Sequence, residues 1–295
     1  MTLGAAPAAT AQTGVTAATV PVTGTLKKIK DDGVVVIGFR DASIPFSYYD
    51  VNQQPIGYSM DITNLILAKI KQVLNAPNLK VRKIPITSQN RIALLQNGTF
   101  DFECNTTTND RARARQVDFS NNFFEIGTRL LTLKTSGIKD FADLKGKTVV
   151  VGAGTTSEKI LRRMNVEKKM GMHIISAKDH TESSLMLKTG RAVAMMMDDA
   201  LLAGERAKMA KPSDYVITGT PQSHEVYGCM MRKNDNGLKT LIDGVIAKAE
   251  TSGEAATIYQ KWFMSPIPPK GLNLDFPMSD DMKALFAHPS SEPVS

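Results

Sequence analysis

Three segments place hydroxyl side chains where a helix is expected to begin directly after a strand. They are residues 87–91, 106–113 and 154–158, and the first two also carry an arginine, Arg91 and Arg113. A helix N-terminus already carries about half a positive charge, so an arginine there is unfavourable unless an anion is bound. Backbone N–H groups, hydroxyls and a guanidinium can all donate to one carboxylate. The recurrence predicts a carboxylate-binding site, although an arginine taken alone more often simply reaches solvent.

The hydroxyl residues are also expected to cap these helices. Ser88 and Thr108 are the predicted N-caps of the first two, which places Arg91 at the third helical position. In the third segment, Thr155 and Glu158 have the spacing of a capping box.

Three further polar side chains follow strand-like runs: Arg40, His180 and Asp198. Ligands of open α/β sheets bind outside the carboxyl ends of strands, so all three are candidates for a pocket. Asp198 is a natural partner for an ammonium group and Asp199 the expected cap of the next helix, but spacing leaves the choice between the two open. A lone histidine is more often structural, which is the alternative for His180.

Short β-rich runs alternate with helical periodicity from residue 33 onward, a pattern typical of βαβ units and largely parallel sheets. The predicted fold class is therefore α/β. The predicted strands are residues 34–39, 79–86, 100–104, 128–133, 147–151, 172–175, 192–197 and 225–232. The predicted helices are residues 59–74, 91–96, 157–168, 181–189, 199–209, 237–251 and 254–263. The Pro-rich tail from residue 266 cannot continue a helix and is expected to pack along a surface.

The chain has 295 residues, which is long enough for two modest lobes. No apolar run approaches the roughly 18 residues that a membrane helix needs. The net charge is +7, but the 36 Lys and Arg alternate with acids, which indicates a solvated basic surface and no nucleic-acid partner. The sequence lacks Walker, GxGxxG and GxSxG motifs and metal-ligand spacings, so no cofactor, metal or catalytic residue is predicted.

Residues 1–24 are rich in Ala, Thr, Gly and Pro and lack the basic and apolar regions of a secretion signal. We interpret them as a disordered leader of an exported protein whose signal peptide is absent from this sequence. In an exported protein the two cysteines, Cys104 and Cys229, are expected to form one disulfide across a long loop. Two buried free thiols are the alternative.

Five longer strings resemble a known family. They are residues 39–50, 85–91, 94–104, 154–158 and 197–207. Together they resemble the polar amino-acid binding proteins that serve ATP-driven uptake transporters, and within that family the branch that binds glutamate and aspartate. The resemblance covers about residues 25–288. It implies a two-lobed, periplasmic-binding-protein-like (type II) fold with the ligand in the cleft between lobes joined by two hinge crossings.

The resemblance also implies a division of the chain. Residues 25–128 would form the first part of lobe 1, residues 129–227 lobe 2, and residues 228–295 the return to lobe 1 and the tail. The hinge crossings are expected near residues 126–131 and 226–230. Both cysteines would then lie close to the hinge, which favours the disulfide.

The resemblance further divides the predicted site by the ligand group that each part would hold. Arg40, Ser88, Arg91 and His180 would hold the side-chain carboxylate; Thr108, Arg113 and Thr156 the α-carboxylate; Asp198 and Thr106 the α-ammonium. In one departure, Asn105 and Thr106 stand where the family has Gly-Ser. The extra methyl group leaves the discrimination between aspartate and glutamate open.

The charged residues favour an acidic ligand independently of the resemblance. Three arginines, a partly charged histidine and one aspartate match a ligand with two carboxylates and one ammonium. We therefore expect a monomeric periplasmic binding protein, not an enzyme, that captures L-glutamate or L-aspartate by hinge closure and delivers it to a membrane ABC-transporter permease. The alternatives are a dehydratase- or lyase-like enzyme of the same fold, with His180 or Asp198 as general acid/base, and a ligand sensor for a membrane receptor.

Overall fold

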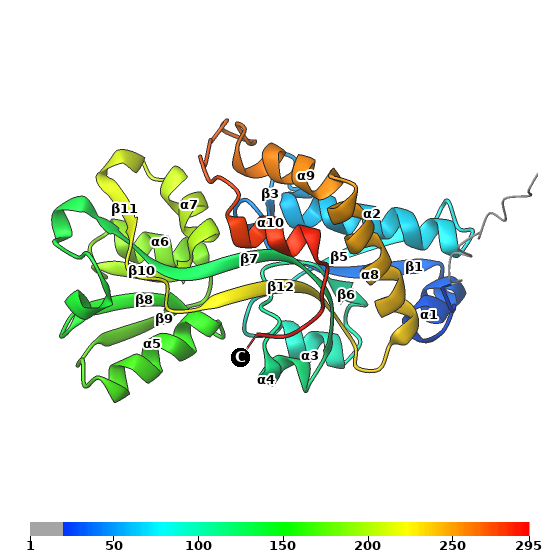
Figure 1. The fold of residues 1–295 in the computed structure, drawn as a ribbon, viewed down its shortest axis with the longest axis horizontal. Helices are drawn as coiled ribbons and strands as arrows, with labels where there is room; N and C mark the ends of the chain where they lie inside the picture. The colour runs from blue at the N-terminus through cyan, green and yellow to red at the C-terminus, as the bar shows by residue number, and fades with distance from the viewer. Residues whose placement is uncertain (1–19, 295) are drawn as a thin grey trace, which may run out of the picture.

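The computed structural model describes residues 20–294 (Figure 1). Residues 1–19 of the predicted leader lie outside the described residues. Residues 20–24, the last of the predicted disordered leader, are part of the fold. Val20 and Val22 pack against the core, and Gly24 begins α1 (Gly24–Asp32). Among the described residues, no helix is long and apolar enough to cross a membrane.

Within residues 20–294, nine strands form one continuous sheet, in which β7 (Asp118–Leu133) is shared by two halves. The first half has the order β5 (Lys80–Pro85), β1 (Val34–Phe39), β6 (Phe102–Glu103), β12 (His224–Met231) and β7. The second half continues from β7 through β10 (Ala194–Asp198), β8 (Thr148–Gly152) and β9 (His173–Ala177), with β11 (Tyr215–Thr218) also paired to β7. Strands β5, β1 and β6 are parallel to one another, and so are β10, β8 and β9, as expected for an α/β fold.

Helices cover both halves of this sheet (Figure 1). The first half carries α1, α2 (Tyr58–Val73), α3 (Arg91–Gln96), α4 (Arg111–Ala114), α8 (Asn236–Thr251), α9 (Glu254–Phe263) and the hairpin strands β2 (Ala42–Ser43), β3 (Ser47–Tyr49) and β4 (Pro55–Ile56). The second half carries α5 (Thr156–Glu167), α6 (His180–Lys188), α7 (Asp199–Ala207) and the short turns η1 (Lys134–Ser136), η2 (Phe141–Leu144) and η3 (Pro212–Asp214). The fold is therefore two-lobed, with β7 and β12 running lengthwise between the lobes (Figure 1).

The sheet pairing shows where the chain passes between the lobes. Along β7, Gly127 pairs with His224 of β12, whereas the next residue, Thr128, pairs with Asp198 of β10. The chain returns between Thr218, the end of β11, and His224. The first crossing falls within the expected residues 126–131, and the second precedes the expected residues 226–230.

Strand β7 is longer than the predicted strand of residues 128–133 because it begins at Asp118. The additional part was missed because Asn121 and Asn122 interrupt its apolar pattern. Both are held by hydrogen bonds: the Asn121 N–H donates to Asp243 Oδ1 at 2.7 Å, and Asn122 Nδ2 donates to the carbonyl of Glu292 at 3.0 Å. Tertiary partners thus place polar residues in a strand that local preference would end.

The tail contains a helix that the sequence analysis did not predict, α10 (Asp280–Ala287). The prolines from residue 266 do end the preceding helix, but Ser279 starts a new one, because its Oγ accepts from the Met282 N–H at 3.0 Å. Met282 and Phe286 are buried, and α10 contacts β7 and α8. The tail therefore packs on the first lobe beside the crossing strand.

Cys104, just after β6, and Cys229 of β12 form the predicted disulfide, which links residues 125 positions apart. A cross-link over so long a loop stabilises a fold by about 4–5 kcal/mol on chain-entropy arguments. The bond lies in the first lobe, next to the strand by which the chain returns from the second. The disulfide therefore holds β12 in place in the first lobe, close to the point where the chain returns from the second lobe.

Candidate functional site

The predicted site residues surround one small enclosed cavity between the lobes, with a volume of about 20 Å³. Its lining includes eight of the nine predicted residues: Ser88, Arg91, Thr106, Thr108, Arg113, Thr156, His180 and Asp198. Arg40 does not line the cavity but donates from Nη1 to Ser88 Oγ at 2.8 Å. Thr155, Met197 and Leu201 also line the cavity and were not predicted. The apolar Met197 and Leu201 carried no sequence signal for a polar site.

Two buried arginines belong to the site: Arg91 lines the cavity, and Arg40 contacts Ser88 of its lining. Arg40 follows the carboxyl end of β1 and is 4% exposed, and Arg91 opens α3 and is 2% exposed. Arg91 Nη1 donates to the Thr106 carbonyl at 2.8 Å and to Thr107 Oγ1 at 2.5 Å. Burial, followed by the charge of Arg113, lowers the pKa of Arg91 to about 9, and burial lowers that of Arg40. With a pKa of about 9, the Arg91 guanidinium is charged at neutral pH.

The predicted cap at Ser88 is wrong. Asn90 precedes α3 as its N-cap, without a side-chain cap bond, and Arg91 is the first helical residue instead of the third. Thr87 and Asn90 satisfy each other's backbone N–H groups with their side chains, at 2.8 and 3.2 Å. This turn leaves the Ser88 hydroxyl free to accept from Arg40 and to face the cavity.

His180 is the first residue of α6 and is 3% exposed. Burial, followed by the charge of Arg40, lowers the pKa of His180 well below its usual value. The imidazole is therefore neutral at pH 7, and the expected partial charge is wrong. Its Nδ1 lies 3.4 Å from Ser43 Oγ, within hydrogen-bond distance. Because His180 belongs to the second lobe and Ser43 to the first, this contact links the two lobes.

Thr108 and Arg113 supply further hydrogen-bond donors to the cavity lining. Thr108 forms an antiparallel bridge with Tyr227, in which the bonds run from Asn109 N–H to Val226 and from Gly228 N–H to Thr107. The N–H and C=O of Thr108 itself therefore point away from β12. Its carbonyl accepts from Arg113 Nη1 at 3.1 Å, so the Thr108 N–H lies on the side of this guanidinium.

The predicted cap at Thr108 is also wrong, because Asp110 caps α4 and accepts from the Arg113 N–H at 2.8 Å. Arg113 is 4% exposed and lies 3.6 Å from the Asp110 carboxylate, measured from Nε. Its Nη2 donates at 3.3 Å to the carbonyl of Gly154 in the other lobe. Arg113 thus contacts both lobes at the cavity.

At the start of α5, Thr155 is the N-cap as predicted and accepts from the Glu158 N–H at 3.1 Å. The Glu158 carboxylate accepts from the Gly154 N–H at 2.9 Å, and not from the N–H of the N-cap Thr155 as in a complete capping box. Thr156 is the first helical residue, and its side chain faces the cavity.

Asp198 closes the cavity at the end of β10. Asp198 itself occupies the N-cap position of α7, but its side chain makes no cap bond. Asp199 is the first helical residue and not the expected cap, and its Oδ1 accepts from the Ala200 N–H at 2.8 Å. The Asp198 carboxylate is therefore left free of a capping role. Asp198 Oδ2 accepts from the Tyr227 hydroxyl, and Oδ1 from Ser157 at 3.4 Å. Burial, followed by the nearby Glu225 carboxylate, raises the pKa of Asp198 to about 7.

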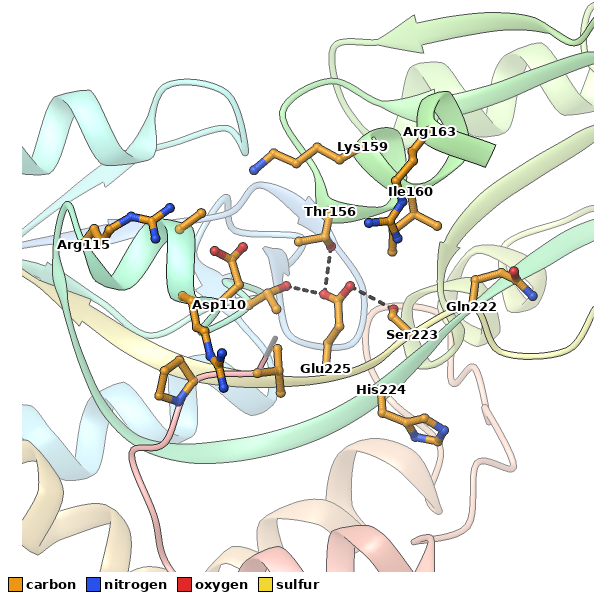
Figure 2. Close-up of a pocket in the computed structure, with 15 residues that line it drawn as sticks. Asp110, Arg115, Thr156, Lys159, Ile160, Arg163, Gln222, Ser223, His224 and Glu225 are labelled. Carbon is orange, nitrogen blue, oxygen red and sulfur yellow. Dashed lines mark hydrogen bonds between the residues drawn. The ribbon is translucent and has the colours of Figure 1, made fainter. Parts of the chain in front are cut away.

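Two further buried acids near the arginines, Glu103 and Glu225, were missed by the sequence analysis. Glu103 accepts from Thr107 Oγ1 and, at 2.9 Å, from Asn105 Nδ2. Glu225 accepts from hydroxyls of both lobes at the floor of a larger groove beside the cavity (Figure 2). The expected ratio of three arginines to one aspartate therefore left out two acids. Both lie in segments that were predicted as buried strands, where their side chains gave no sign of a polar site.

Two lobes that close over a small polar cavity, lined by two arginines and an aspartate, define a two-lobed binding protein. The chain belongs to the bacterial extracellular solute-binding proteins, family 3, whose profile matches residues 35–265. It is 59% identical to the glutamate/aspartate import solute-binding protein of Salmonella typhimurium, over 92% of this chain and 90% of that protein. It is also 59% identical to the L-glutamate/L-aspartate-binding protein of Pseudomonas aeruginosa, with the same shares covered.

Among solved structures, the fold is similar to an ArgBP mutant from T. maritima, with a TM-score of 0.72 and 28% identity over 81% of this chain and 99% of that one. It is also similar to AncCDT-1, described as an ancestral amino acid-binding protein and a precursor of cyclohexadienyl dehydratase. That likeness has a TM-score of 0.70 and 28% identity over 81% of this chain and 99% of that one.

Proposed function

We propose that this protein binds L-glutamate and L-aspartate between its lobes and delivers them to an ABC-type importer. One observation carries the acidic specificity. Arg40 and Arg91 are both buried, and the charge of the buried Glu103 acts on both of them. Among the described residues, however, no carboxylate lies within 4.0 Å of either guanidinium. The Nε atoms of both arginines are buried and lack a hydrogen-bond partner within residues 20–294. A buried cation requires a counter-charge, which the side-chain carboxylate of an acidic amino acid would supply.

The remaining residues fit the amino-acid end of the same ligand. Arg113 and the N–H groups of Thr108 and Thr156 are suited to the α-carboxylate, and Asp198 to the α-ammonium. Ser88 and the neutral His180 would complete the polar shell around the side-chain carboxylate. The names of the relatives from Salmonella and Pseudomonas, which specify glutamate and aspartate, agree with this arrangement.

The lobe limits proposed from the sequence agree with the sheet pairing at the first crossing. Residues 25–128 and 228–295 would form lobe 1, and residues 129–227 lobe 2, with residues 219–227 as the return crossing. The lobes already touch through Arg113 and Gly154 and through Ser43 and His180, and Asp198 also contacts Tyr227 of the return crossing. We infer that a monomer in the periplasm opens along β7 and β12 to admit the ligand, and that the permease recognises the closed form.

A calorimetric panel of glutamate, aspartate, glutamine, asparagine and histidine tests this function directly. Glutamate and aspartate should bind at least about 100-fold more tightly than their amides, because an amide leaves a buried arginine without a counter-charge. Equal affinity for glutamine and glutamate would contradict the acidic specificity.

A second candidate function is a dehydratase- or lyase-like reaction on an acidic substrate. It is favoured by the likeness to AncCDT-1 and by Asp198, whose pKa of about 7 suits a general acid or base. NMR spectra of purified protein with candidate diacids distinguish the two functions. Steady turnover supports the enzyme, and unchanged ligand with saturable binding supports the transport protein.

A further inference from the structure

Glu225 occupies an unusual position between the lobes. It lies at the start of β12, is 4% exposed, and forms the floor of a groove of about 640 Å³ (Figure 2). Thr108 from one lobe and Thr156 from the other line both this groove and the small enclosed cavity. Glu225 itself lines only the groove, so the two threonines stand between its carboxylate and the cavity.

The carboxylate of Glu225 is the acceptor of a hydrogen-bond network that joins both lobes and the crossing strands. Thr108 Oγ1 and Thr156 Oγ1 donate to Oε2 at 2.6 and 2.8 Å, and Ser223 Oγ donates to Oε1 at 2.9 Å (Figure 2). Thr128 Oγ1 lies 3.0 Å from Ser223 Oγ. Because Ser223 gives its hydrogen to Glu225, Thr128 is the donor of that bond.

Counting hydrogens fixes what the two threonines can offer to the cavity. An ionised carboxylate only accepts, and a hydroxyl has one hydrogen and two lone pairs. Thr108 and Thr156 both line the cavity and give their hydroxyl hydrogens to Glu225, so toward a ligand in the cavity these hydroxyls can act only as acceptors. An acceptor suits an ammonium group and repels a carboxylate. The α-carboxylate of a ligand must then be held by N–H donors, which Arg113 and the Thr108 backbone provide.

We propose that Glu225 is a positioning residue that orients the hydroxyls of Thr108 and Thr156 as acceptors for the α-ammonium group of the bound amino acid. Glu225 itself does not contact the ligand. Together with Asp198, the two hydroxyls make this end of the cavity selective for a protonated amine. This role rests on the proposed function, because it concerns the amino-acid end of the same ligand.

The test compares L-glutamate with glutarate, which has both carboxylates but no ammonium group. Calorimetry, with glutarate measured by displacement of glutamate, gives the ratio of the two affinities. In Glu225→Leu no acceptor holds the threonine hydrogens, so the hydroxyls can turn and donate into the cavity. The preference for glutamate over glutarate should fall by about tenfold or more.

The conservative variant Glu225→Gln should rescue this preference to within about threefold of the unmodified protein. Its amide oxygen can replace Oε2 and keep both threonines as donors, while its NH₂ group faces Ser223. Glu125→Leu is the matched control. It replaces a glutamate of the neighbouring strand β7 by the same residue, and Glu125 does not line the cavity. It should leave the ratio unchanged.

If Glu225 only latched the lobes together, Glu225→Leu would weaken glutamate and glutarate equally, and the unchanged ratio would overturn the proposal. Equal losses of the ratio in Glu225→Leu and Glu225→Gln would also overturn it, since charge alone would then explain the effect. Should Glu225→Leu not fold, Thr108→Val and Thr156→Val each remove an acceptor and must lower the same ratio. A failure of the unmodified protein to bind glutamate would instead refute the proposed function.

Discussion

At the scale of single residues, one of the three buried arginines of the site lies next to an acid, and the other two do not. Arg113 lies 3.6 Å from Asp110, whereas Arg40 and Arg91 have only neutral partners among the described residues. The sequence indicated Arg91 and Arg113 because arginine breaks the preference of helix starts for acids, and Arg40 because it follows a strand. It did not reveal Glu103 or Glu225, because an acid inside an apolar strand has no local signature until the fold shows its partners.

Substituting a ligand-facing arginine tests this division. Arg91→Ala and Arg113→Ala should each weaken glutamate binding by more than about 2 kcal/mol, because each leaves a ligand carboxylate buried without its partner. Calorimetry measures the loss, and Arg111→Ala, an exposed neighbour on α4, is the control. Near-unchanged affinity in both variants would refute the assigned site.

The pKa of Asp198 makes binding depend on pH. With that pKa raised to about 7, the carboxylate becomes protonated below neutrality and loses its attraction for the ligand ammonium. Protonation competes with binding, so affinity for glutamate should fall about tenfold between pH 8 and pH 6. His180 adds no charge in this range, because its pKa is lowered. Asp198→Asn should bind weakly with a flat pH profile, and an equally steep profile in that variant would assign the titration elsewhere.

At the scale of elements, regular structure was predictable where the chain is locally consistent. The predicted helices of residues 91–96 and 254–263 coincide with α3 and α9, since periodic apolar residues and their end signals agree there. Errors arose where distant partners decide. Asp243 and Glu292 hold the asparagines that extend β7, and the core captures α10 of the tail.

The caps show the same limit on a smaller scale. Thr155 was identified correctly because its partner Glu158 lies three residues away, within the same helix. Ser88 and Thr108 were misassigned because their hydroxyls bond to Arg40 and Glu225, which are 48 and 117 residues away. Their hydroxyls bond to distant residues of the site and not to the backbone N–H groups of the nearby helix, which is the local role that serine and threonine usually have at a helix start.

Helix α8 contains a residue whose effect on stability should be measurable. Glu250 lies in the last turn, is 5% exposed, and its carboxyl oxygens lack hydrogen-bond partners among the described residues. Burial raises its pKa to about 9, and the negative end of the helix dipole also disfavours its ionised form. The unfolded chain therefore loses this proton at lower pH than the folded protein does, so stability falls as pH rises from about 4.5 to about 9.

Glu250→Gln should accordingly raise the free energy of unfolding at pH 7 by on the order of 1–3 kcal/mol, and by much less at pH 4.5. Urea denaturation at the two pH values measures the difference. Glu167→Gln, an exposed residue in the last turn of α5, is the matched control and should change little at either pH. An equal gain at both pH values would show that ionisation is not the cause.

At the scale of the whole molecule, closure brings backbone and side chains of the two lobes into direct contact. Gly204 of α7 lies so close to the hairpin of β2 and β3 that a Cβ atom there would be 2.2 Å from the carbonyl oxygen of Ile44. Gly154 is similarly close to Gln89, where a Cβ would lie 2.8 Å from the backbone Cα. Gly154 also has a φ of +75°, which its turn within the second lobe requires, whereas Gly204 has no such constraint, so its close contact with Ile44 relates to the closed arrangement of the lobes.

Gly204→Ala should therefore oppose closure while leaving each lobe folded. Alanine has a higher helix propensity than glycine, so α7 itself should not be weakened. The clash with Ile44 forces the lobes apart, and affinity for glutamate should fall at least about tenfold, or 1.4 kcal/mol. Small-angle scattering should show a radius of gyration that no longer decreases when glutamate is added. Gly244→Ala on α8, where a Cβ would meet nothing within 4 Å, should close normally. If Gly204→Ala also closed and bound normally, contact between α7 and the hairpin would not limit the closed state, and closure would instead rest on the contacts of Arg113, His180, Glu225 and Asp198.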